Sequence, residues 1–99
     1  MNGMRQIESD EASRVVESGS VRPPGELLRA AEARHAGGRG GLGLEYGRDE
    51  DDSARYLFST EVEDGDGAVW SMILDARTGD VLKDERIPVD DEGAPEESA

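Results

Sequence analysis

The stretch WSMILDARTGDVL, residues 70–82, decides the fold predicted for this chain. Trp70, Met72 and Leu74 recur at every second position and so share one face of a strand, opposite Ser71 and Ile73. The segment DARTG, residues 75–79, then supplies turn residues, and Gly79 can adopt the left-handed backbone of a bulged hairpin turn. The stretch therefore predicts two antiparallel strands joined by a tight turn. Asp75 is predicted to be a strand-end residue of that turn and not a catalytic acid.

The length of this turn sets the register of the next strand, which is predicted over residues 81–89. A three-residue loop at 77–79 places Leu82 opposite Leu74, and a four-residue loop places Val81 there instead. The sequence is compatible with both loops. Which of the two apolar residues faces the core therefore stays open.

The preceding hairpin is better determined. Residues 54–63 and 68–76 both alternate, and a DGDG turn separates them. A three-residue loop with Gly67 left-handed places Val62 opposite Trp70 and brings both apolar sets to one face, whereas a two-residue loop would put them on opposite faces. The pattern therefore predicts the three-residue loop. The predicted core face consists of Tyr56, Phe58, Trp70 and Met72.

One amphipathic helix is predicted before these strands, in GELLRAAEARHAGG, residues 25–38. Leu27, Leu28 and Ala31 form its apolar stripe, and the two glycines at its end stop it. The glycine-rich segment 38–47 predicts a short edge strand, because glycine at this density is unfavourable inside a central strand. The fold class is therefore α+β, with one N-terminal helix packed on a curled antiparallel meander of three to four strands.

Charge divides the chain into three parts. The formal net charge is −13, of which −2 falls on residues 1–20, −6 on residues 21–88 and −5 on residues 89–99. We interpret these parts as a flexible or loosely docked N-terminal arm, a folded domain and an acidic disordered tail. Within the arm, a short helix over residues 9–17 is an alternative to disorder or loose docking.

Composition excludes several classes of function. The chain has no cysteine, which rules out disulfides and thiolate chemistry. Phosphate contacts need a basic patch, so nucleic-acid binding is not expected. No apolar run approaches the roughly 20 residues that span a bilayer, so membrane insertion is not expected. The first residues show no secretory signal.

No catalytic, cofactor-binding or metal-binding residue is predicted. His35 is the only histidine, and neither a Gly-x-Ser-x-Gly elbow nor a second histidine at zinc-helix spacing accompanies it. A capping or partly exposed position near the helix end is expected for it. The acidic loop at residues 49–52 is expected to be solvated, and whether it binds a cation stays open.

The sheet face opposite the helix is the candidate site for a partner. Its residues mix apolar and hydroxyl side chains with Glu61 and Glu63, which suits either plain surface or a contact with a protein partner or a second copy of the chain. The predicted residues of this face are Leu57, Ser59, Val69, Ser71 and Ile73.

Together these elements resemble the PepSY domain family. The helix at 25–38, the strand YLFSTEV at 56–62, the DG turn at 66–67 and the stretch at 70–82 follow the pattern of that family. The resemblance covers roughly residues 25–84, which is most of the part predicted to fold.

The resemblance implies a two-layer, cystatin-like fold and a non-catalytic module that binds a protein. PepSY domains occur in propeptides of secreted metallopeptidases and are thought to inhibit or regulate peptidases. The implied partner is therefore a peptidase and the implied location extracytoplasmic, although the lack of a signal in the given chain leaves the cytoplasm open. The sequence departs from the family pattern in its glycine-rich segment at 37–43 and its acidic insert at 48–52.

The alternative function rests on charge. An acidic interaction protein, or a mimic of a nucleic acid, would bind a basic partner through its excess of carboxylates. Enzymatic activity is not expected, because no constellation of residues supports it.

Overall fold

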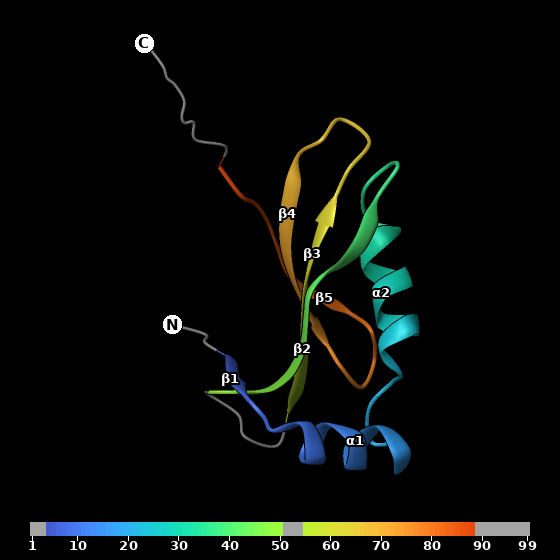
Figure 1. The fold of residues 1–99 in the computed structure, drawn as a ribbon, viewed down its shortest axis with the longest axis vertical. Helices are drawn as coiled ribbons and strands as arrows, with labels where there is room; N and C mark the ends of the chain where they lie inside the picture. The colour runs from blue at the N-terminus through green and yellow to red at the C-terminus, as the bar shows by residue number, and fades with distance from the viewer. Residues whose placement is uncertain (1–3, 51–54, 89–99) are drawn as a thin grey trace.

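The computed structural model describes residues 4–50 and 55–88. Over these residues, two helices and five antiparallel strands make an α+β domain, with strand order β1-β2-β3-β4-β5 (Figure 1). The elements are β1 (Met4–Gln6), α1 (Ser9–Glu17), α2 (Pro24–Glu32), β2 (Arg39–Asp49), β3 (Tyr56–Glu63), β4 (Val69–Asp75) and β5 (Val81–Arg86). The predicted class is confirmed. One helix and three to four strands were too few, because α1 and β1 form from the N-terminal arm.

The core lies between α2 and the sheet. Leu27 and Ala31 of α2 are fully buried against Phe58, Met72 and their strand neighbours. Pro24 begins the helix, since its fixed φ suits the first helical turn. Each fully buried Leu, Met or Phe contributes roughly 1.5–3 kcal/mol relative to an exposed one. The helix stripe and the core face of the sheet therefore account for most of the stability of this layer pair.

The β3–β4 hairpin has the predicted register. Val62 lies opposite Trp70, and the pairing continues without a shift along both strands. At the turn, the N–H of Asp64 donates to the carbonyl oxygen of Ala68 over 2.8 Å, and Gly67 has a φ of 88°. The three-residue loop with a left-handed glycine is confirmed.

The β4–β5 connection combines the two loops that the sequence left open. Next to the turn, Val81 lies opposite Leu74, as a four-residue loop requires. The register then shifts at Leu82, which is the extra residue of a bulge and is 47% exposed. Val81 therefore faces the core. Beyond the bulge the strand follows the register of the three-residue loop, which places Asp84 opposite Met72.

The strand β2 is longer than predicted, and it lies at the edge of the sheet over residues 39–46, since β1 pairs only with its last three residues. It runs for 11 residues between β1 and β3. Gly41 and Gly43 have φ values of 114° and 63° where the register with β3 shifts, so these glycines make bulges within the strand and do not end it. Two residues apart in this strand, Leu44 is 43% exposed while Tyr46 packs against the core.

β1 and α1 cover one end of the sheet, and α1 crosses that end while α2 runs along the strands (Figure 1). β1 pairs with the last three residues of β2. α1 contains no buried residue, although Val15 and Val16 pack against the margin of the core. Its Glu11 accepts hydrogen bonds from Arg48 and from the hydroxyl of Tyr56. α1 is thus the helical alternative that the sequence offered for this segment.

Candidate functional site

The face of the sheet that turns away from the helices is the candidate site. Phe58, Met72 and the other core residues point toward α2, so alternation turns their neighbours in β3 and β4 to the opposite side. We call this side the open face. The predicted site residues all lie on it: Leu57, Ser59, Val69, Ser71 and Ile73.

Pairing across the strands assembles the open face. Ser59 lies opposite Ile73, and in the next row Ser71 lies between Glu61 of β3 and Glu85 of β5. Neighbouring strands are about 4.8 Å apart, so the side chains of one row are within reach of each other. The structure therefore brings the predicted residues together as one continuous patch.

These five residues are not equally available to a partner. Leu57 is only 4% exposed, and it lies opposite Gly47. The side chain of Met4 fills the space that a Cβ atom on Gly47 would need. The other four residues are partly exposed. Leu57 is therefore buried and unavailable to a partner, whereas the other four present part of their side chains to solvent.

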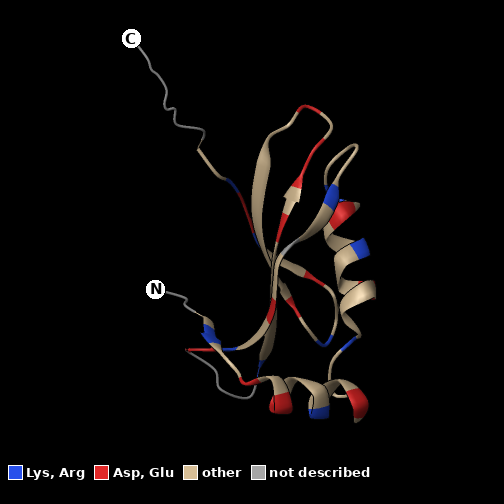
Figure 2. Ribbon diagram, in the orientation of Figure 1, with Lys and Arg blue, Asp and Glu red and all other residues tan. Residues whose placement is uncertain are grey.

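Charged side chains surround the open face. Lys83 and Glu85 form an ion pair with 3.6 Å between Nζ and Oε1, and Arg55 Nε lies 4.0 Å from Asp75 Oδ2. Exposed pairs of this kind contribute about 0–1 kcal/mol. Figure 2 shows acidic and basic residues interspersed along the helices as well. The rim is thus charged with both signs, and the centre combines apolar and hydroxyl groups with the carboxylate of Glu61.

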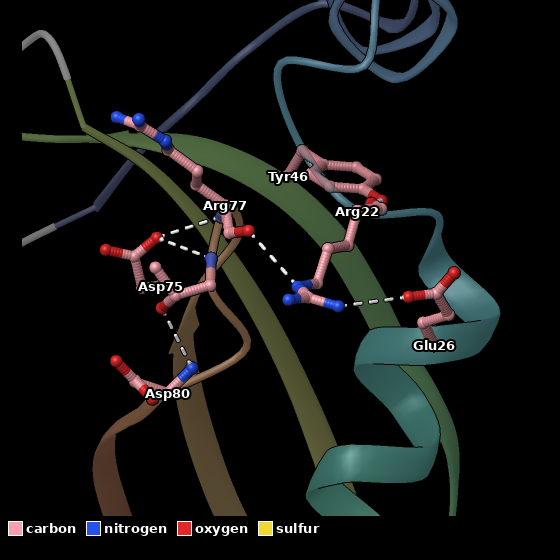
Figure 3. A network of polar contacts seen from close by, with 7 residues as sticks. Arg22, Glu26, Tyr46, Asp75, Arg77 and Asp80 are labelled. Carbon is pink, nitrogen blue, oxygen red and sulfur yellow. Dashed lines mark hydrogen bonds and ion pairs between the residues drawn. The ribbon is translucent and has the colours of Figure 1, made fainter.

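Asp75 closes the β4–β5 turn beside this face (Figure 3). Its Oδ1 accepts from the backbone N–H of Arg77 at 2.8 Å and of Thr78 at 3.2 Å, and its own N–H donates to the carbonyl oxygen of Asp80. Arg22 approaches the same turn and donates from Nε to the carbonyl oxygen of Arg77 over 3.1 Å. The carboxylate of Asp75 thus serves the turn, in agreement with its predicted strand-end position.

A second polar cluster, which the sequence did not predict, joins the turn after α2 to β4 and β5. The ring of His35 stacks on Trp70, with 4.1 Å between centroids and 22° between planes. Its Nε2 lies 2.9 and 3.1 Å from the two carboxylate oxygens of Asp84. The indole N–H of Trp70 donates to Asp64 over 2.9 Å, and this hydrogen bond is the main cause that lowers the pKa of Asp64.

The predicted helix over 25–38 was too long, because α2 ends at Glu32 and His35 lies three residues beyond it; the partners of His35 were not predicted. Asp84 faces His35 because the bulge at Leu82 shifts the register of β5, and without the bulge Lys83 would lie opposite Met72. The only hint of this cluster in the sequence was composition. The chain has one histidine and one tryptophan, and the tryptophan is predicted on the helix side of the sheet.

Metal ligation finds no support in the part of the chain that the structure describes, where no group of three or more His, Asp or Glu residues could hold an ion. In the acidic loop, Asp49 and Glu50 are described, whereas Asp51 and Asp52 lie outside the described residues. Whether this loop binds a cation therefore stays open. Among residues 4–50 and 55–88, no helix has the length and apolar character needed to cross a bilayer.

A family model for the peptidase propeptide and YPEB domain, PepSY, matches residues 23–85. The chain belongs to the PepSY family. The match begins just before α2 and ends within β5, so the PepSY region contains α2 and β2–β5 but neither β1 nor α1. Comparison with curated proteins and with solved structures gave no match. Both the open face and the cluster around His35 belong to the PepSY region.

Proposed function

We propose that this PepSY protein is a non-catalytic module that binds a protein and thereby regulates or inhibits a peptidase outside the cytoplasm. The observation that carries the proposal is the arrangement of the layers. Both helices pack on one side of the sheet, while the open face presents partly exposed apolar and hydroxyl side chains. The family, which takes its description from peptidase propeptides, supplies the class of partner.

The open face suits a partner better than the edges of the sheet do. On one edge, β5 has a bulge at Leu82 followed by four charged residues, 83–86, and both features disfavour the addition of another strand. At the other edge, β1 covers the end of β2, and the carboxylate of Glu32 accepts the N–H of Gly40 over 2.7 Å. The open face lacks comparable protection among the described residues.

The chemistry of the open face fits a protein contact without catalysis. Val69 and Ile73 offer apolar area whose burial favours association, and Ser59 and Ser71 can donate or accept hydrogen bonds without the desolvation penalty of a charge. The pairs Lys83–Glu85 and Arg55–Asp75 would then lie at the solvent-exposed border of the contact, whereas Glu61 would lie within it. Such a module would act by occupying a surface of the peptidase.

A binding and inhibition assay with secreted metallopeptidases tests this proposal. The variant Ser71→Lys places a long side chain in the centre of the open face. The fold should persist, because the carboxylates of Glu61 and Glu85 on either side carry the opposite charge. Ser13→Lys on α1 makes the same change at an exposed position on the helix side. We expect the wild type and Ser13→Lys to inhibit peptide hydrolysis and Ser71→Lys to bind about tenfold more weakly.

Three results would contradict parts of the proposal separately. Equal inhibition by Ser71→Lys and Ser13→Lys would exclude the open face as the contact. Binding that both variants keep but that disappears at about 0.3 M salt would support the acidic alternative, because the screening length is then only several Å. A protein that binds none of the metallopeptidases would exclude that class of partner.

A further inference from the structure

The cluster around His35 connects three segments that are far apart in the sequence. His35 follows α2, Trp70 lies in β4 and Asp84 lies in β5, and the ring of His35 contacts both of the other side chains. The side chains of His35 and Asp84 are 13% and 16% exposed. Their interaction is therefore partly shielded from water.

Protonation changes what this contact contributes. A neutral imidazole offers Asp84 an ordinary hydrogen bond, whereas an imidazolium makes a charge-assisted bond that is roughly twice as strong. An imidazolium stacked on an indole also gains a cation–π attraction. Histidine changes charge between about pH 5 and 8. We propose that His35, Trp70 and Asp84 form a pH-dependent clamp, which tightens on acidification and holds β5 and the β3–β4 hairpin against the end of α2.

The neighbouring charges decide the direction of this effect. Asp84 and Asp64, from β5 and from the hairpin turn, favour a positive ring, and Asp64 reaches it through the indole N–H. Arg34 of the turn after α2 lies 3.7 Å from Asp84, and Arg86 of β5 lies opposite Trp70, so both arginines oppose a positive ring. The side chain of Arg34 is 55% exposed, and solvent therefore weakens its effect. Of these four charges, the carboxylate of Asp84 is the one within hydrogen-bond distance of the ring.

Fluorescence gives a first test, because the chain contains one tryptophan and one histidine. A protonated imidazole in contact with an indole quenches indole emission. Titration of the full chain from about pH 8.5 to about pH 5 should lower the emission of Trp70 in a single-proton step. His35→Gln keeps a polar side chain of similar size but cannot take up the proton, so this step should be absent.

Hydrogen exchange gives a second test, which asks whether the clamp holds β5. After correction for the intrinsic pH dependence of exchange, the amides of residues 84–87 should exchange several-fold faster at about pH 8.5 than at about pH 5.5. The buried amides of Phe58 and Val62 in β3 provide the internal control. Asp84→Asn keeps a hydrogen-bonding group but removes the charge, so it should abolish this pH dependence and leave the fluorescence step in place.

Either test can overturn the proposal. A fluorescence titration of His35→Gln that matches the wild type would show that the emission of Trp70 does not respond to the protonation of His35. Exchange in β5 that is independent of pH in the wild type, or equally pH-dependent in Asp84→Asn, would show that no charge-dependent clamp holds this strand.

Discussion

The PepSY region and the N-terminal segment, residues 4–17, are held in place by different forces. In the PepSY region, Leu27, Phe58 and Met72 are fully buried between two layers. The N-terminal segment has no buried residue in α1. It is attached through three backbone pairs of β1, the polar contacts of Glu11 and the partly buried side chains of Val15 and Val16. Apolar burial contributes about 25 cal/mol per Å², whereas exposed polar contacts contribute little. The family fold should therefore be stable alone, and the N-terminal segment should act as an addition to it.

The largest expected effect is in the core of the PepSY region. Phe58→Ala removes a fully buried ring at the centre of the sheet and should lower the free energy of unfolding by about 3–5 kcal/mol. Val16→Ala in α1 removes a partly buried side chain and should lower it by about 1 kcal/mol or less. Urea denaturation followed by circular dichroism measures both. Equal losses would show that α1 shares the core fully.

A smaller effect is expected when residues 1–20 are deleted. The shortened chain keeps Val21, α2 and β2–β5 and should still unfold cooperatively, with a stability reduced on the order of 2 kcal/mol from the lost contacts of Val15 and Val16. Thermal denaturation and the dispersion of the amide NMR spectrum measure the result. A shortened chain without cooperative unfolding would show that the N-terminal segment is part of the folding unit.

Acidification should release the N-terminal segment before the PepSY region. The hydrogen bond from Arg48 is the main cause that lowers the pKa of Glu11 below its ordinary value of 4.5. Because the folded-state pKa is lowered, the contact stabilises α1 above pH 4.5 and is lost as the pH falls through the folded-state pKa. The amides of α1 should therefore lose protection at a higher pH than those of β3.

The control for this prediction is a second glutamate of the same segment. Glu11→Gln should remove the acid-dependent release of α1, whereas Glu8→Gln, at the exposed N-cap without a side-chain capping bond, should retain it. Hydrogen exchange between about pH 3 and about pH 6 measures the difference. Identical behaviour of the two variants would show that Glu11 does not hold α1.

The smallest expected effect is at Tyr46, where the two regions meet. Burial raises the pKa of Tyr46 to about 12, and its hydroxyl donates to the carbonyl oxygen of Arg22 over 2.6 Å. Because the folded-state pKa is raised above its ordinary value of 10, this contribution is present below pH 10 and is lost as the pH rises toward 12. In an ultraviolet titration, Tyr46→Phe should remove a tyrosine ionisation near pH 12. In urea denaturation, the same variant should lower the free energy of unfolding by about 1 kcal/mol or less. A tyrosine step near pH 10 that disappears in this variant would contradict the assignment.

The sequence predicts which residues share the candidate site, but it does not predict how exposed each of them is. The alternation of β3 and β4 assigns the five residues of the open face to one side, because successive side chains of a strand point in opposite directions. The same pattern cannot show that Leu57 is buried on that side. Leu57 lies opposite Gly47 of β2, and the side chain of Met4 from β1 packs on that glycine, so residues of two other strands surround it. Contacts of this kind follow from strand order and not from periodicity.

The sequence by itself determined the β3–β4 hairpin, its three-residue turn and the stripe of α2 that covers it. One register alone places both apolar sets on the same face, and the glycine needed for that turn stands at position 67. Only the tertiary structure decided the bulge at Leu82, the length of β2 and the docking of the N-terminal segment. These features depend on contacts between residues far apart in the chain. A bulge shifts the register of a strand by one residue. Packing against His35 and the core then selects which side chains of β5 face the helix.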